Sequence, residues 1–273
     1  MKKAIIFAIS LIFSIGLNAQ EALDVAILKC KYTFSHIVNV PDNKGYSEVM
    51  ILEVGKNICS FYCEKNRVFD SIVNTGALDY MFDTRSINVS QLPKRNINLE
   101  TKLYFNLPTD KITVQDAIFT NSYEYIEDIE KIDWKIYPNE TRKILGYNCK
   151  KATCRFRGRD YEVWYATLIP ISRGPWKFSG LPGLILAVSD SQNQIQFECT
   201  EIRITSVPIV KYASKIDDRA TKVERKEFLQ LQRKFYENPA TALGGVELTS
   251  ISDENGNPVS LPKNRPYNPI ELE

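Results

Sequence analysis

The feature that most constrains the fold of this chain is an alternation of apolar and polar side chains with a period of two. Between residues 26 and 34 the even positions are apolar, whereas Lys29, Lys31 and Thr33 occupy odd ones. Successive side chains of a strand point to opposite faces, so this pattern predicts a half-buried β-strand. Further strands are predicted at residues 48–54, 57–63, 111–119, 134–137, 150–156, 161–165, 184–189 and 194–204. Short polar breaks between several of these segments indicate antiparallel hairpins.

Two irregularities refine this prediction. In the segment 194–204, Ile195, Phe197 and Cys199 share one parity, but Ile202 and Ile204 have the other. A β-bulge near Thr200 and Glu201 would return the apolar side chains to one face. Residues 184–188 are apolar at both parities, which predicts a strand covered on both of its faces.

One convincing helix is predicted, from Lys222 to about Glu237. Thr221 and Glu224 have the spacing of a capping box, and Asn238-Pro239 ends the helix. We therefore expect an α+β protein that is predominantly antiparallel β, with one curved, half-barrel-like sheet. This C-terminal helix and the loop 169–183 should cover the sheet.

The domain organisation follows from the two ends of the sequence. Lys2 and Lys3 precede an apolar run, Ala4 to Leu17, and a small-residue cleavage site, which together predict a secretory signal peptide over residues 1–19. The apolar run is shorter than the roughly 20 residues of a membrane span. We expect one β-rich domain over residues 20–254 and an extended, proline-rich tail over 255–273, either a surface tail or a partner-docking segment. The mature protein should be exported to the periplasm or cell envelope and be soluble after cleavage near Ala19, with no transmembrane segment.

The charge of the chain argues against nucleic acid as a partner. The full sequence has 35 basic and 33 acidic residues, and removal of the signal peptide also removes Lys2 and Lys3. The mature chain is then formally neutral, whereas a nucleic-acid-binding protein needs a clustered positive field.

Six cysteines lie in the exported part, and an oxidising compartment makes all of them disulfide candidates. Strand geometry would place Cys59 too far from Cys63 for a bridge, and Cys149 too far from Cys154. Buried free thiols and a zinc site are the alternatives, although there is no CxxC pair and His36 is the single histidine. The candidates are Cys30, Cys59, Cys63, Cys149, Cys154 and Cys199.

The segment Gly180-Leu181-Pro182-Gly183-Leu184-Ile185 resembles the signature of the GLPGLI family. Other stretches that are similar to this family are residues 55–57, 145–152, 156–161, 164–165, 174–178 and 266–272. The resemblance implies an exported envelope protein of Gram-negative bacteria without an assigned activity. Arg173 departs from the family pattern, in which Asp or Asn often precedes the Gly-Pro pair, and this puts a shared binding role for the position in doubt.

The glycines and prolines of the loop 169–183 suit fixed turns, and Trp176 and Phe178 would anchor the loop to the sheet. Alternatively the loop closes one end of a concave sheet and places Trp176 beside a ligand. The candidate ligand-binding residues are Trp164, Tyr165, Arg173, Trp176, Leu181 and Pro182.

No catalytic residue, metal site or cofactor motif is predicted. A catalytic triad or dyad would have to be built around His36, and GxSxG, HExxH and phosphate-binding glycine motifs are absent. Carboxylates at Asp79 and Asp83, or at Glu124, Glu127 and Asp128, have no spacing that selects acid–base chemistry or calcium binding. Lys151, Arg155, Arg157 and Arg159 share a strand parity and would line up as a basic stripe, which is either a contact for acidic sugars, lipopolysaccharide or an acidic partner, or a paired and solvated face.

Three hypotheses for function remain. The first is a non-enzymatic envelope protein that binds a protein partner or a ligand. The second is a periplasmic carrier that shelters an apolar ligand, such as a lipid, in the concavity of the sheet, with Trp164, Tyr165 and Trp176 as lining. The third is a hydrolase or metal-dependent enzyme that uses His36 and nearby carboxylates.

Overall fold

The structure is a computed structural model that describes residues 22–74, 99–119, 121–211, 220–239, 251–252, 258–259 and 265–273. The predicted signal peptide, the carboxylates Asp79 and Asp83 and part of the predicted tail lie outside the described residues. In the described part, no helix is both long enough and apolar enough to cross a membrane.

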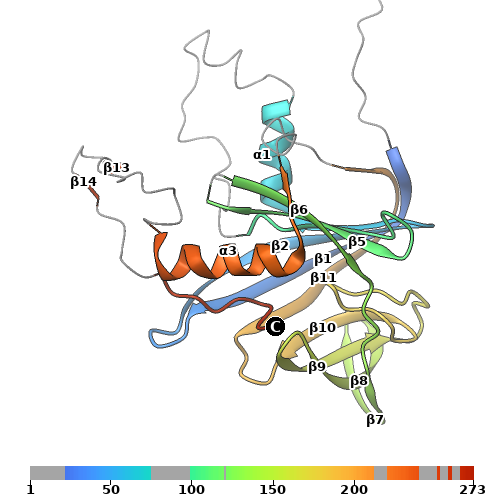
Figure 1. Ribbon diagram of the computed structural model, residues 1–273. Coiled ribbons are helices and arrows are strands. Elements are labelled where there is room, and N and C mark those ends of the chain that lie inside the picture. The colour runs from blue at the N-terminus through green and yellow to red at the C-terminus, as the bar shows by residue number, and fades with distance from the viewer. Residues whose placement is uncertain are drawn as a thin grey trace, which may run out of the picture.

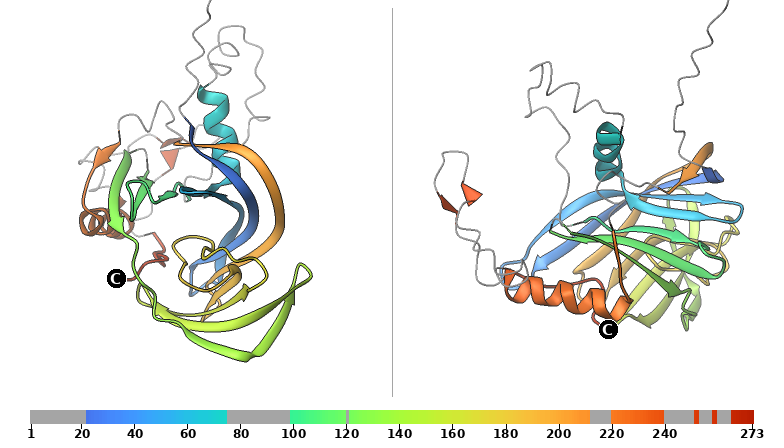
Figure 2. Two further views of the ribbon diagram at one scale, coloured as in Figure 1. Left: turned by 90° about the vertical axis from the view of Figure 1, so that its right-hand side faces the viewer. Right: turned by 45° about the horizontal axis from the view of Figure 1, so that its top comes forward.

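Within the described residues, twelve strands form one sheet in the order β12-β6-β5-β4-β3-β2-β1-β11-β10-β9-β8-β7. Neighbouring strands are antiparallel except for the short parallel pair β12 and β6. The sheet twists and curls so that its two ends approach the same side of the molecule (Figures 1 and 2). The strands are β1 Ala22–Asn39, β2 Lys44–Gly55, β3 Cys59–Cys63, β4 Lys102–Phe105, β5 Lys111–Ile118, β6 Asn121–Asp128, β7 Lys135–Ile144, β8 Tyr147–Phe156, β9 Arg159–Ala166, β10 Leu184–Asp190, β11 Ile195–Val210 and β12 Thr221–Lys222.

A separate two-stranded sheet pairs β13 Ile251–Ser252 with β14 Pro258–Val259. The prediction of a mostly antiparallel β protein with a C-terminal helix is confirmed. Strands β4 and β6 were not predicted, because β4 has only four residues and the partly acidic β6 alternates weakly.

Two helices are described, α1 Glu64–Asn74 and α3 Arg225–Glu237. The predicted end of α3 is confirmed, but its predicted start is wrong. Thr221 and Lys222 pair with strand β6 instead of opening the helix, and the cap residue Glu224 makes no side-chain capping hydrogen bond. A backbone pairing with a neighbouring strand has therefore replaced the capping box. Helix α1 was not predicted.

The bulge predicted in β11 is confirmed. Lys31 pairs with Glu201 and Tyr32 pairs with Cys199, so Thr200 is the extra residue on the β11 side. Phe197 and Cys199 are buried, and Ile202, on the other parity, also packs against the core. The prediction that the bulge also returns Ile204 to this face is wrong, because Ile204 is 87% exposed.

The loop between β9 and β10 packs onto the sheet, as expected. Phe178 is fully buried, and its ring meets that of Tyr161 edge to face at 4.9 Å. Trp134 Nε1 donates a 2.9 Å hydrogen bond to the Ser179 carbonyl. At Gly183 a Cβ atom would lie 2.3 Å from the Ala166 carbonyl oxygen, so only glycine allows the loop to approach β9 this closely.

The six disulfide candidates are free, buried thiols in the structure, and the expected bridges are absent among them. Burial raises the pKa of Cys149 to about 11 and that of Cys154 to about 12. A thiol with so high a pKa is almost entirely protonated at neutral pH, so these two cysteines act as small apolar core residues.

Candidate ligand cavity

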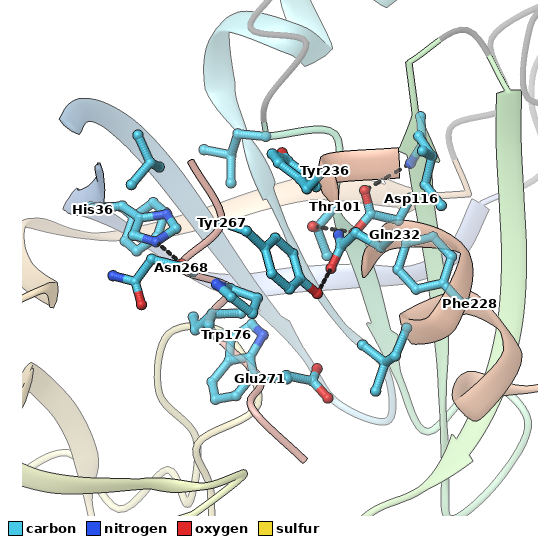
Figure 3. Close-up of a pocket in the computed structure, with 18 of the residues that line it drawn as sticks. His36, Thr101, Asp116, Trp176, Phe228, Gln232, Tyr236, Tyr267, Asn268 and Glu271 are labelled. Carbon is cyan, nitrogen blue, oxygen red and sulfur yellow. Dashed lines mark hydrogen bonds between the residues drawn. The ribbon is translucent and has the colours of Figure 1, made fainter. Parts of the chain in front are cut away.

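A cavity of about 130 Å³ lies between the concave face of the sheet, helix α3 and the C-terminal segment Arg265–Glu271 (Figure 3). Strands β1, β2, β3, β5 and β6 provide one wall, and the loop before β10 contributes Trp176. Helix α3 packs on β5 and β6 at one end of the sheet, on the side that lines the cavity (Figure 2).

Aromatic rings make up much of the cavity wall. Phe34 and Phe197 stack with their centroids 4.4 Å apart, and Phe61 meets Phe197 at 6.2 Å. On the helix side, rings from the sheet, the helix and the C-terminal segment come together. The pairs are Tyr125 with Phe228, Phe119 with Phe235, and Tyr236 with Tyr267, at 5.4, 6.0 and 4.9 Å.

The helix residues that face the cavity share one stripe of α3. Phe228, Gln232 and Phe235 follow a spacing of four and three residues, which places them on the same side of a helix. Phe228 and Phe235 are buried, whereas Gln230 on another side of the helix is exposed.

The cavity has a polar end near Asp116 on β5. One carboxylate oxygen of Asp116 accepts a 2.6 Å hydrogen bond from the Thr101 hydroxyl, and the other accepts one from the Ala117 amide. Tyr267 donates to Gln232 Oε1 over 3.4 Å on the same side of the cavity (Figure 3). Burial raises the pKa of Asp116 to about 7, so at neutral pH its carboxyl can donate or accept a hydrogen bond.

The C-terminal segment is held against β1 by His36. The ring Nε2 of His36 lies 2.6 Å from the Asn268 carbonyl, and Nδ1 lies 3.2 Å from the Tyr46 hydroxyl. Burial lowers the pKa of His36 to about 4, so the ring is neutral at pH 7. A carbonyl can only accept, so Nε2 carries the proton and Nδ1 accepts from Tyr46. Both ring nitrogens of the single histidine therefore make hydrogen bonds within the fold.

Arg159 and Asn268 add to the same attachment. Arg159 donates to the Pro269 carbonyl and to the Asn268 side chain at 2.6 Å each, and it pairs with Asp190 at 2.8 Å. Asn268 in turn donates to the Ile37 carbonyl. A segment more than 200 residues from β1 in sequence is in this way tied to it by several hydrogen bonds.

Further along the segment, Glu271 enters a buried group of charges. It pairs with Lys177 and with Arg225, and Lys177 also pairs with Glu127. Burial alone would raise the pKa of Glu271, but the two cations outweigh this effect and hold the pKa below its ordinary value. The glutamate is therefore ionised and fixes the segment beside the cavity.

The structure brings only one of the predicted ligand-binding residues, Trp176, to this cavity. Tyr165 and Leu181 are buried in the core, and Pro182 is exposed. Arg173 lies over the ring of Phe105 at 5.4 Å. Trp164 lies on the opposite face of β9 from Tyr165, because neighbours in a strand alternate, so the two residues cannot line one concavity as expected.

The predicted basic stripe is not one strand face. Lys151 and Arg155 belong to β8, Arg157 lies in the turn that follows, and Arg159 begins β9. All four are ion-paired: Lys151 with Glu140 and Glu162, Arg155 with Asp160 and Glu273, Arg157 with Glu127 and Glu130, and Arg159 with Asp190.

The carboxylates considered for catalysis or calcium binding are also paired. Glu124 contacts Gln115 and Lys211, Glu127 contacts Lys177, and Asp128 pairs with Lys111. Over the part of the chain that the structure describes, no three His, Cys, Asp or Glu side chains gather as a metal site would require.

The sequence analysis missed Asp116, although a signal was present. In the predicted strand 111–119, Asp116 occupies the same parity as Ile112, Val114 and Ile118. An acidic residue on the buried side of a strand either is ion-paired or belongs to a functional site. This pattern could have identified Asp116 as a candidate site residue.

Comparison with known proteins gives one family match. A family model described as the N-terminal domain of an N-glycanase matches residues 100–227. Two solved structures of PNGF-II, in space groups C2 and P21, each align with a TM-score of 0.49, at 15% and 16% identity. The alignments cover 77% and 78% of this chain but only 33% and 34% of PNGF-II, so the chain spans about a third of its length.

A structure of MucB in complex with MucA(peri) aligns with a TM-score of 0.28 at 6% identity, covering 71% of this chain and 55% of MucB. No curated protein sequence matches the chain.

Proposed function

We propose that this is an exported, non-enzymatic binding protein whose cavity takes a small apolar ligand with one hydrogen-bonding group. The observation that carries the proposal is the cavity itself, which has aromatic walls and a polar end at Asp116, Thr101 and Gln232. Binding pockets for small molecules are typically apolar, with a few placed polar groups. A cavity of about 130 Å³ is close to the size that accommodates one six-membered ring.

The proposal combines the first two sequence-based hypotheses and favours a small ligand over a protein partner in this cavity. Export and a place in the periplasm or envelope rest on residues 1–19 and on the resemblance to the GLPGLI family. We do not extend a glycanase activity to this chain, because His36 and the carboxylates Glu124, Glu127 and Asp128 are engaged in structural hydrogen bonds and ion pairs.

Filling the cavity tests the proposal. Calorimetric titration with p-cresol, a single apolar ring with one hydroxyl, should show saturable binding to the wild-type protein. Gln232→Trp places a large ring where Gln232 faces the cavity and should weaken probe binding by about tenfold or more. Gln230→Trp is the matched control, since it makes the same change on an exposed side of the same helix and should bind the probe as the wild type does.

Probe binding that is absent, or that both tryptophan variants retain equally, would contradict the proposal. A natural ligand is sought by native mass spectrometry of the purified protein before and after solvent extraction. We expect the wild-type protein to carry the added mass of a bound ligand, which extraction removes. The Gln232→Trp variant should be purified without this added mass.

A further inference from the structure

A second hollow, of about 440 Å³, lies on the face of the sheet opposite to the cavity, across β9, β10 and β11. Phe197 of β11 points into the cavity, so its neighbours Gln196 and Glu198 point to this other face. The same alternation places Trp164 here, because Val163 and Tyr165 on either side of it are buried in the core.

Trp164 and its cross-strand neighbour Ala187 both line this hollow. Trp164 lies opposite Ala187 of β10, and Ala187 lies opposite Glu198 of β11. Ala187, which has only a methyl side chain, therefore lies between the half-buried Trp164 and Glu198 across the three strands. Trp164 Nε1 donates a 3.0 Å hydrogen bond to Glu162, which pairs with Lys151 at 2.9 Å, so the orientation of the ring is fixed.

The rim carries hydrogen-bonding groups that are already ordered. Arg142 of β7 pairs with Glu198 at 2.8 Å, yet their side chains remain 46% and 59% exposed. Ser189 donates to the Asn193 side chain at 2.9 Å, and Gln196 Nε2 lies 3.4 Å from Asn193. The lining of the hollow therefore combines one indole with hydroxyl, amide, guanidinium and carboxylate groups.

The charges at the hollow are paired. Arg142 pairs with Glu198, Lys151 pairs with Glu162 and Glu140, and Asp190 pairs with Arg159, so these groups are already neutralised by one another and none of them selects an ionic ligand. A pyranose ring has the complementary chemistry, since its C–H face packs on an aromatic ring and its hydroxyls exchange hydrogen bonds at the edge. A purely apolar molecule would displace water from the exposed rim groups without replacing the hydrogen bonds that the water makes.

We propose that the hollow formed by Trp164, Ala187, Gln196, Glu198 and Arg142 is a binding site for a neutral saccharide. The site is separate from the aromatic cavity, because the two lie on opposite faces of the sheet. It is also different in charge from the basic stripe considered above, which would have selected acidic sugars.

Calorimetric titration of the full chain with maltotriose, cellotriose, mannotriose and triacetylchitotriose tests this site. We expect at least one of these neutral trisaccharides to bind saturably and to shift the tryptophan emission. Trp164→Ala should weaken that binding by about tenfold or more, whereas Trp164→Phe, which keeps an aromatic face, should retain most of it. Gln196→Ala should weaken it, and Gln192→Ala, at an exposed position outside the hollow, should not.

Three results would overturn the proposal: no binding of any of these trisaccharides at millimolar concentration, equal binding by Trp164→Ala, or tighter, salt-sensitive binding of sialyllactose and digalacturonate. Circular dichroism and thermal unfolding establish that each variant is folded. Binding of p-cresol should be the same in Trp164→Ala as in the wild type, which separates this site from the cavity.

Discussion

At the scale of single residues, His36 shows how one buried side chain joins two distant parts of the chain. Its neutral ring donates to the Asn268 carbonyl and accepts from Tyr46, with Arg159 and Asp190 close by. A protonated ring could not accept from Tyr46 and would place a charge next to the Arg159 guanidinium. The C-terminal attachment therefore depends on a neutral histidine.

This dependence predicts how stability varies with pH. The pKa of His36 is about 4 in the folded protein and about 6.5 when unfolded, so between these values the unfolded state binds more protons and stability falls as pH falls. The loss by pH 4 should be about 3 kcal/mol. Urea unfolding of the wild type and of His36→Gln at pH 7, 5.5 and 4.5 measures it.

Other groups titrate in both proteins, so the informative quantity is the difference between the two unfolding free energies. The unfolding free energy of the wild type minus that of His36→Gln should fall steadily as pH falls from 6.5 to 4. Parallel curves for the two proteins would show that His36 is not held neutral by the fold.

At the scale of elements, the turn between β8 and β9 and the C-terminal segment determine each other's position. Gly158 has a φ of +81°, and a Cβ atom there would lie 2.7 Å from the Leu272 Cβ. Gly146, in the turn between β7 and β8, has a similar φ of +86° but open space around it. Both glycines have a positive φ, which side chains disfavour, but only Gly158 also has the C-terminal segment close to the position of a Cβ atom.

The pair gives a matched test of the attachment. Gly146→Ala should cost about 1 kcal/mol through backbone strain alone. Gly158→Ala should cost about 1–3 kcal/mol more, because the C-terminal segment must shift. Urea unfolding measures both costs, and carboxypeptidase should release residues from the segment faster in Gly158→Ala only. Equal costs and equal digestion would mean that the segment adjusts freely.

How much could be read from the sequence also depends on the element. Local patterns sufficed for β11, where the parity change predicted the bulge at Thr200, and for the end of α3 at Glu237. They failed at the start of α3, because Thr221 and Lys222 pair with β6, a strand almost 100 residues earlier. Local patterns failed again for the cavity. Of the predicted ligand-binding residues only Trp176 lines it, because the rest of the wall is assembled from segments that are distant in sequence.

At the scale of the whole molecule, the C-terminal segment is a wall of the cavity and a bridge across the fold. It contacts β1 through Asn268, the turn after β8 through Leu272, and α3 through Glu271 and Arg225. Removal of residues 265–273 should therefore lower stability and open one side of the cavity at the same time.

Complementation in trans measures this role. The chain shortened by residues 265–273 should unfold at a lower urea concentration than the full chain and lose saturable binding of p-cresol. A synthetic peptide of sequence RPYNPIELE should bind the shortened chain and restore probe binding, and a peptide in which the Glu271 equivalent is Gln should do so more weakly because Lys177 and Arg225 lose their ion pair. A shortened chain that binds the probe as well as the full chain does would remove the segment from the cavity wall.

The contact between Asn268 and His36 also sets an order of events. Ribosomes make a polypeptide from its N-terminus, so β1 exists long before residues 265–271 have been joined to the chain. Until residues 265–271 have been joined to the chain and have docked, the aromatic cavity lacks one wall. A copy whose synthesis has not passed residue 271 would therefore lack part of the site for the ligand that we propose.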